Sequence, residues 1–146
     1  MKFKIFRIVL QGLGLLFLLA VTVFILIRWQ ELPAEIPAHF DAAGHADSFS
    51  SKTSLISLLV VAWVSYGLFT VLSYFPRFWN LPVKSPRAYQ IAGVLMPVLG
   101  LMLALIFGWI SLRSAQGLDL GRWFMPVVLA GVGVPLLVLI VGGLRE

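Results

Sequence analysis

Two short His-x-Asp patterns are the densest group of side chains in this sequence that could take part in chemistry. His39 and Asp41 form the first pattern, and His45 and Asp47 form the second. Imidazole and carboxylate groups bind zinc and similar divalent ions, so one interpretation is a metal site. However, the spacing matches no strong zinc pattern, and the sequence has no cysteine. We therefore favour a loop in which these groups hydrogen-bond to the backbone or contact a partner.

Nucleophilic catalysis has less support in the same segment. Ser48, Ser50 and Ser51 lie near the two histidines, but no nucleophile-elbow motif surrounds them. The sequence also has no glycine-rich phosphate loop. We therefore expect no catalytic residue, no cofactor and no enzymatic activity.

The composition shows what kind of element must position these residues. Of the 146 residues, 60% are hydrophobic and only 12% are charged. A soluble domain has about 45–50% apolar and about 25% charged residues. The sequence therefore excludes an ordinary soluble enzyme, a disordered tail and a disulfide scaffold, and it predicts an integral membrane protein.

Four apolar runs are long enough to cross a bilayer, which takes about 20 residues in a helix. None contains Asp, Glu, Lys or Arg, and they cover residues 8–27, 55–75, 91–110 and 124–144. We predict an all-α protein with a four-helix transmembrane bundle as a single domain over residues 1–146. The first run is longer than the apolar core of a signal peptide, about 7–15 residues, so we expect it to be retained.

The distribution of basic residues predicts the orientation. Seven of the 11 lie in the terminal segments and residues 76–90, and four lie in residues 28–54 and 111–123. Basic residues favour the cytoplasmic side, so both termini should be cytoplasmic and residues 28–54 should form an extracytoplasmic loop. Because the basic residues flank the spans, the net charge of +5 favours contact with anionic lipid headgroups over nucleic acid.

The loop at residues 28–54 has the pattern of a structured segment. Pro33 and Pro37 favour extended backbone around them. Alternation of apolar and polar residues over 36–41 predicts a short strand, and residues 41–44 end in a glycine suited to a turn. We therefore predict a β-hairpin on the outer membrane surface.

Lys52 is an unusual residue just before the second span, because a cation at a helix N-terminus opposes the helix dipole. Two explanations remain open. Lys52 pairs with Asp41 or Asp47 in the acidic loop, or its amine extends to a lipid headgroup. Serine and threonine residues at 50–54 offer N-caps for the same helix.

A stripe of small residues occurs in the third run. Gly100, Ala104 and Gly108 repeat at a spacing of four, which lets two helix backbones approach closely. The stripe predicts either a packing face within the bundle or the seam of a homo-oligomer.

The loop also carries a longer pattern, Leu32-Pro33-x-x-Ile36-Pro37-x-His39-Phe40-x-x-x-Gly44-x-x-Asp47, followed by Ser51-Lys52. This pattern resembles the signature of the domain of unknown function 1648 in SdpI-like bacterial membrane proteins, over roughly residues 15–65. The resemblance implies a multi-pass protein of the bacterial cytoplasmic membrane with the signature outside. It does not single out Asp41 or His45, which leaves His39 and Asp47 as the metal candidates. The candidate binding or loop-structuring residues are therefore Pro33, Pro37, His39, Phe40, Gly44, Asp47 and Lys52.

Three functions follow from these observations. SdpI-type proteins confer immunity to a secreted toxin, so the resemblance implies a non-catalytic protein whose outer loop binds a peptide or protein in immunity or sensing. A small transporter or channel subunit is the alternative, although the spans lack the ionisable residues that mark ion paths. A metal-dependent membrane enzyme is the third.

Overall fold

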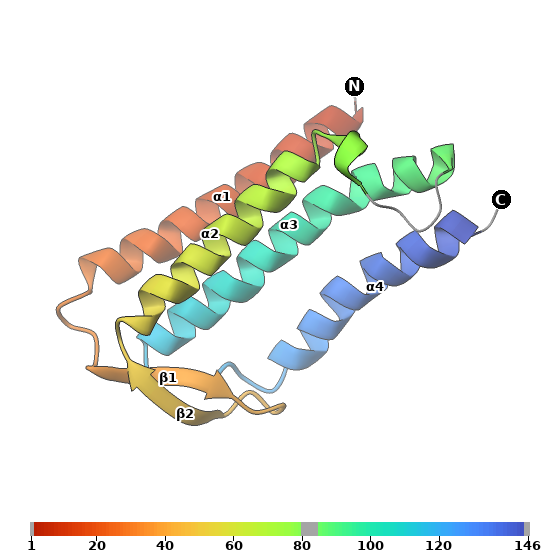
Figure 1. The fold of residues 1–146 in the computed structure, drawn as a ribbon. Coiled ribbons are helices and arrows are strands. Elements are labelled where there is room, and N and C mark those ends of the chain that lie inside the picture. Colours follow the sequence, from red (N-terminus) through yellow and green to blue (C-terminus); the bar gives the residue numbers. More distant parts are fainter. Residues whose placement is uncertain (1, 80–84, 145–146) are drawn as a thin grey trace.

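The computed structural model describes residues 2–79 and 85–144. Within these ranges the chain is mostly helical, and four helices are long and apolar enough to cross a membrane. This confirms the predicted architecture, including the hairpin between the first two helices (Figure 1). In chain order the elements are α1 (Lys2–Ile27), β1 (Glu35–Phe40), β2 (Ala46–Ser51), α2 (Ser54–Leu72), the 3-10 turn η1 (Pro76–Phe78), α3 (Pro86–Ala115) and α4 (Phe124–Leu144).

Helix α3 is the centre of the bundle. It packs against α1, α2 and α4, whereas α1 and α2 contact each other far less. Figure 1 shows α4 beside α3 and apart from α1 and α2. The outward faces of the helices expose large apolar side chains such as Leu16, Val64 and Leu129. Such faces are stable in contact with lipid tails, so the exposure is consistent with a bilayer environment.

The small-residue stripe of α3 lies where α1 and α2 approach it. Ala104 is fully buried in a cluster with Leu18 and Tyr66. A Cβ atom added to Gly100 would lie 3.1 Å from the Cβ of Phe69 on α2, and one added to Gly108 would overlap the ring of Phe17 on α1. The stripe therefore faces the interior of the bundle.

The helices differ in length from the apolar runs. Helix α3 begins five residues before its run, because Ser85 caps it by accepting a hydrogen bond from the backbone N–H of Ala88 and Pro86 occupies the first turn. Helix α2 ends at Leu72, before the end of its run. Side chains complete the bonding there, since Trp79 Nε1 donates to the Leu72 carbonyl and Arg7 Nη1 donates to the Ser73 carbonyl. The apolar runs therefore do not determine where each helix begins and ends.

The hairpin lies at one end of the bundle, and the start of α1 and the end of α4 lie at the other (Figure 1). At the hairpin end, Ile36 of β1 is 1% exposed and packs among Val21, Ile25, Leu55 and Leu59 from α1 and α2. Burial of this side chain attaches the base of the hairpin to the helix ends, so the hairpin folds onto the bundle.

Candidate binding surface at the hairpin

The two strands of the hairpin are antiparallel and irregular in register. Glu35 pairs with Ser51 at the open end, and His39 pairs with Ser48. The register shifts on both sides of His39, so that Ala38 and Asp47 have no partner in the pairing. Such bulges redirect side chains, and they change the alternation that the sequence predicts for residues 36–41. In the structure Ile36 and Pro37 are both buried although they are neighbours.

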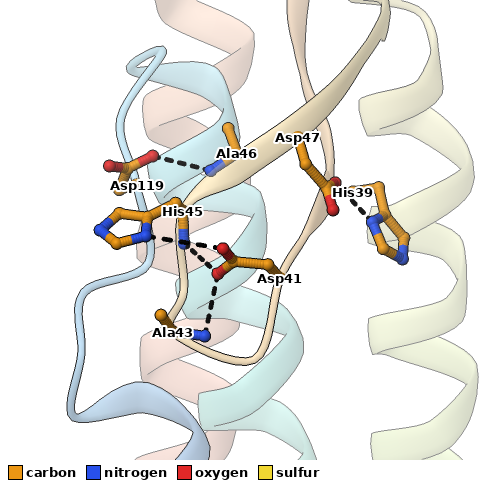
Figure 2. Close-up of polar contacts among 7 residues, drawn as sticks. All are labelled: His39, Asp41, Ala43, His45, Ala46, Asp47 and Asp119. Carbon is orange, nitrogen blue, oxygen red and sulfur yellow. Dashed lines mark hydrogen bonds and ion pairs between the residues drawn. The ribbon is translucent and has the colours of Figure 1, made fainter.

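The turn of the hairpin is organised by Asp41. Its Oδ1 accepts hydrogen bonds from the backbone N–H groups of Ala43 and His45, each at 2.9 Å (Figure 2). Its own N–H donates to the His45 carbonyl, and Gly44 donates to the Asp41 carbonyl. The hydrogen bond from the His45 backbone is the largest cause that lowers the pKa of the Asp41 carboxyl group, and that from Ala43 adds to it. The predicted turn is therefore held by an aspartate that favours its charged form.

The turn is also bonded to the loop between α3 and α4. The carbonyl of Gly44 accepts a hydrogen bond from the N–H of Leu120 at 2.8 Å. The N–H of Ala46 donates to Asp119 Oδ1 at 2.8 Å (Figure 2). Gly44 has a φ of 84°, and a Cβ atom added to it would lie 2.7 Å from the carbonyl oxygen of Gly121. A glycine is required here both for its conformation and for the close approach of the two backbones.

Two side chains of helix α3 donate hydrogen bonds to the backbone of the α3–α4 loop. Arg113 Nε donates to the carbonyl of Asp119 at 2.6 Å, and Trp109 Nε1 donates to the carbonyl of Leu120 at 3.2 Å. Our sequence reasoning missed Asp119, Leu120 and Gly121 as parts of this site. One feature of the sequence could have indicated this contact: Asp119 is the acidic residue that lies neither in the first loop nor at the C-terminus.

The histidines and aspartates pair across the hairpin, not within each His-x-Asp pattern. His39 Nδ1 lies 2.5 Å from Asp47 Oδ1, and His45 Nδ1 lies 3.6 Å from Asp41 Oδ2 (Figure 2). All four side chains are exposed, so they can exchange these contacts for contacts with a partner. Within residues 2–79 and 85–144 there is no group of three His, Cys, Asp or Glu side chains placed to hold a metal ion.

Within the described residues, Lys52 forms no ion pair with Asp41 or Asp47, and it bonds to the end of α1 instead. Its Nζ donates to the carbonyl of Trp29 at 3.0 Å and lies 5.3 Å from the centre of the Trp29 ring. Trp29 lies just past the C-terminal end of α1, where carbonyl groups lack helical partners and the helix dipole is negative. Because α1 and α2 are antiparallel, a lysine before α2 stabilises the end of α1.

The other signature residues lie along the same hairpin. Pro33 is exposed ahead of β1, and the next residue, Ala34, accepts a hydrogen bond from the N–H of Lys52 at 2.9 Å. Phe40 is half-buried at the end of β1 and pairs with Ala46. Thr53 precedes α2 without a side-chain cap. The hairpin thus gathers Pro33, Pro37, His39, Phe40, Gly44 and Asp47, with Lys52 just after it.

Comparison with known proteins finds a family match in the segment that contains the hairpin. Residues 16–64 match a domain of unknown function, DUF1648, and the matched segment runs from within α1 through the hairpin into α2. An uncharacterized protein of Archaeoglobus fulgidus is 28% identical over 123 aligned residues, which cover 73% of this chain and 67% of that protein. No solved structure matches the chain. The expected DUF1648 signature is therefore confirmed.

Proposed function

We propose that this multi-pass membrane protein with a DUF1648 domain is a non-catalytic binding protein whose hairpin captures a peptide or protein partner outside the cytoplasmic membrane. The observation that carries the proposal is a contrast within the hairpin. Burial of Ile36 holds the base of the hairpin, hydrogen bonds to Asp41 hold its turn, and the bond from Leu120 to Gly44 holds its tip. Strand β2, in contrast, is exposed over most of its length. A rigid element that presents an open surface loses little conformational freedom on binding.

Strand β2 offers backbone groups for recognition. Among the described residues the sheet has two strands, so each strand has a strand partner on one side only. An extended peptide binds such an edge by adding a further strand, with affinity supplied by main-chain hydrogen bonds. Strand β1 faces the bundle through Ile36 and Pro37, so β2 is the edge that we assign to the partner.

Side chains on the hairpin supply the specificity. Phe49 of β2 is 59% exposed, so its aromatic ring is available to a partner. The His39–Asp47 pair adds a donor and an acceptor on the same hairpin. An aromatic anchor accompanied by a few polar groups is typical of the residues that dominate binding energy at protein interfaces.

The resemblance to SdpI-like proteins supports one class of partner. Those proteins confer immunity to a secreted toxin, and the positive-inside distribution favours a hairpin that faces the outside of a bacterial cell. We therefore propose that the partner is a secreted peptide or protein, and that its capture serves immunity or sensing.

Affinity purification of the full chain from native membranes in mild detergent tests this proposal. His39→Ala and Phe49→Ala should each lose a captured peptide or protein that mass spectrometry identifies with the wild type. Ser48→Ala is the matched control, because Ser48 is exposed in the same strand and pairs with His39 in the register. If both variants capture the same molecules as the wild type, the hairpin is not the binding site.

A further inference from the structure

A second candidate site lies at the opposite end of the bundle. A cavity of about 690 Å³ opens between the first turns of α1, the end of α2 and the first turns of α3. Its polar lining comes from Lys4, Arg7, Ser73 and Gln90, and its aromatic lining from Trp79 and Tyr89. None of these residues belongs to the hairpin, so the cavity is independent of the proposed binding surface.

The cavity carries positive charge without acidic partners. Within residues 2–79 and 85–144, neither Lys4 nor Arg7 forms an ion pair with a carboxylate. The acidic residues in those ranges lie in the hairpin segment or in the α3–α4 loop, at the other end of the molecule. Two cations that line one cavity without a counter-ion attract an anion, especially where the dielectric constant is low.

Arg7 is held in place by groups that leave its charge uncompensated. Nη1 donates to the Ser73 carbonyl at 2.9 Å, and the guanidinium lies 3.8 Å from the centre of the Tyr74 ring. Its Nε is buried and has no hydrogen-bond partner among the described residues. An arginine has five N–H donors, so a fixed guanidinium with unused donors is suited to a phosphate group, which accepts two of them at once.

The aromatic wall favours a position of the cavity near the boundary between membrane and water. Trp79 is 7% exposed and stacks on Tyr89 with ring centres 6.1 Å apart. Tryptophan and tyrosine concentrate at the level of lipid headgroups. Arg7 is in the second turn of α1, and Gln90 is in the second turn of α3, which is the same depth from the helix starts.

We propose that this cavity binds the phosphate group of an anionic ligand. Arg7 donates to the phosphate oxygens, Lys4 adds charge at the mouth, and the side-chain amide of Gln90 offers a further donor. A lipid headgroup and a soluble phosphate share this chemistry. Basic cavities between spanning helices on the cytoplasmic side suit anionic headgroups.

Native mass spectrometry of the full-length protein in detergent tests the proposal, with phosphatidylglycerol as the probe and phosphatidylcholine as the neutral comparison. We expect phosphatidylglycerol to bind preferentially. Lys4→Gln and Arg7→Gln should each lower its affinity by about fivefold, the equivalent of one basic residue near a headgroup. Gln90→Glu should also weaken binding by placing a negative charge in the cavity.

Arg122→Gln is the matched control, because it removes the same charge from an exposed residue at the opposite end. Lys4 and Gln90 are exposed, so their variants remain informative if Arg7→Gln fails to fold. Inorganic phosphate distinguishes the two sources: displacement of the lipid assigns a soluble phosphate, and retention of the lipid assigns the headgroup. Equal affinity in the wild type, Lys4→Gln and Gln90→Glu would overturn the proposal.

Discussion

The backbone N–H of Leu120 donates a hydrogen bond to the carbonyl of Gly44 at 2.8 Å, which joins the tip of the hairpin to the α3–α4 loop. Gly44 belongs to the segment that matches DUF1648, and Leu120 lies far outside it. The hairpin therefore depends on the second half of the chain for its position. The first half of the chain carries the signature. Helix α3 and the α3–α4 loop hold the hairpin that contains this signature in place.

The close approach of Gly44 to Gly121 predicts that Gly44→Ala is strongly destabilising. An alanine there needs a left-handed conformation, which costs about 1–2 kcal/mol. Its Cβ would also lie 2.7 Å from the Gly121 carbonyl oxygen, and such overpacking costs about 1–3 kcal/mol more. The free energy of unfolding in mixed micelles measures the loss.

Gly117→Ala is the control for that prediction. Gly117 also has a positive φ, of 69°, but an added Cβ atom meets nothing within 4 Å. It should therefore show the conformational cost alone. Equal destabilisation of the two variants would mean that the contact with Gly121 has no effect.

Asp119 should stabilise the hairpin through one specific hydrogen bond. Asp119→Ala removes the acceptor for the Ala46 N–H and should cost about 1 kcal/mol. Asp119→Asn keeps a carbonyl oxygen in the same place and should cost less. Hydrogen exchange of the Ala46 amide reports the bond directly, and unchanged protection in Asp119→Ala would contradict the prediction.

The four helices were predictable because a bilayer imposes a length and a composition on any segment that crosses it. Their exact ends were not. The end of α2 depends on the side chains of Arg7 and Trp79, which come from other elements. The alignment of α1 beside α2 that brings Arg7 to this end is a property of the packed bundle, and no local pattern encodes it.

The hairpin was predictable from its prolines and its turn, but the pairing of its polar side chains was not. Both His-x-Asp patterns suggested a local unit, whereas the shifts in register bring His39 to Asp47 and leave Asp41 with His45. A local pattern also gave no sign that Lys52 bonds to the end of α1. Strand pairing within the hairpin decided the first outcome, and the placement of α1 beside the start of α2 decided the second.

Lys52 should stabilise the junction between α1 and α2. Lys52→Met keeps the aliphatic chain but loses the hydrogen bond to the Trp29 carbonyl, which should cost about 1 kcal/mol. Lys52→Arg keeps a donor and a charge, so it should lie closer to the wild type. Thermal unfolding in detergent compares the three proteins, and a Lys52→Met variant as stable as the wild type would favour a role at lipid headgroups instead.

Acid should loosen the hairpin turn through Asp41. Hydrogen bonds from the backbone N–H groups of His45 and Ala43 lower the pKa of this carboxyl group below its usual 3.8. The folded turn thus favours the carboxylate, so its contribution to stability is fully present above about pH 4 and is lost as the pH falls through the folded-state pKa. Amide chemical shifts of Ala43 and His45 across an acid titration measure the change. Asp41→Asn keeps the acceptor without a charge, and an identical acid transition in that variant would assign the effect to another group.

The positive-inside distribution predicts which residues are accessible from outside the cell. The sequence has no cysteine, so single cysteines can be introduced without removing native ones. Ser48→Cys in β2 should react with an impermeant thiol reagent in intact cells. Gln90→Cys, at the opposite end of the bundle, should react only after the membrane is permeabilised. Gln90 is the better choice at that end than Ser85, which is 4% exposed and caps α3, because a buried thiol fails to react on either side. Labelling of Gln90→Cys but not of Ser48→Cys in intact cells would reverse the topology and place the hairpin in the cytoplasm.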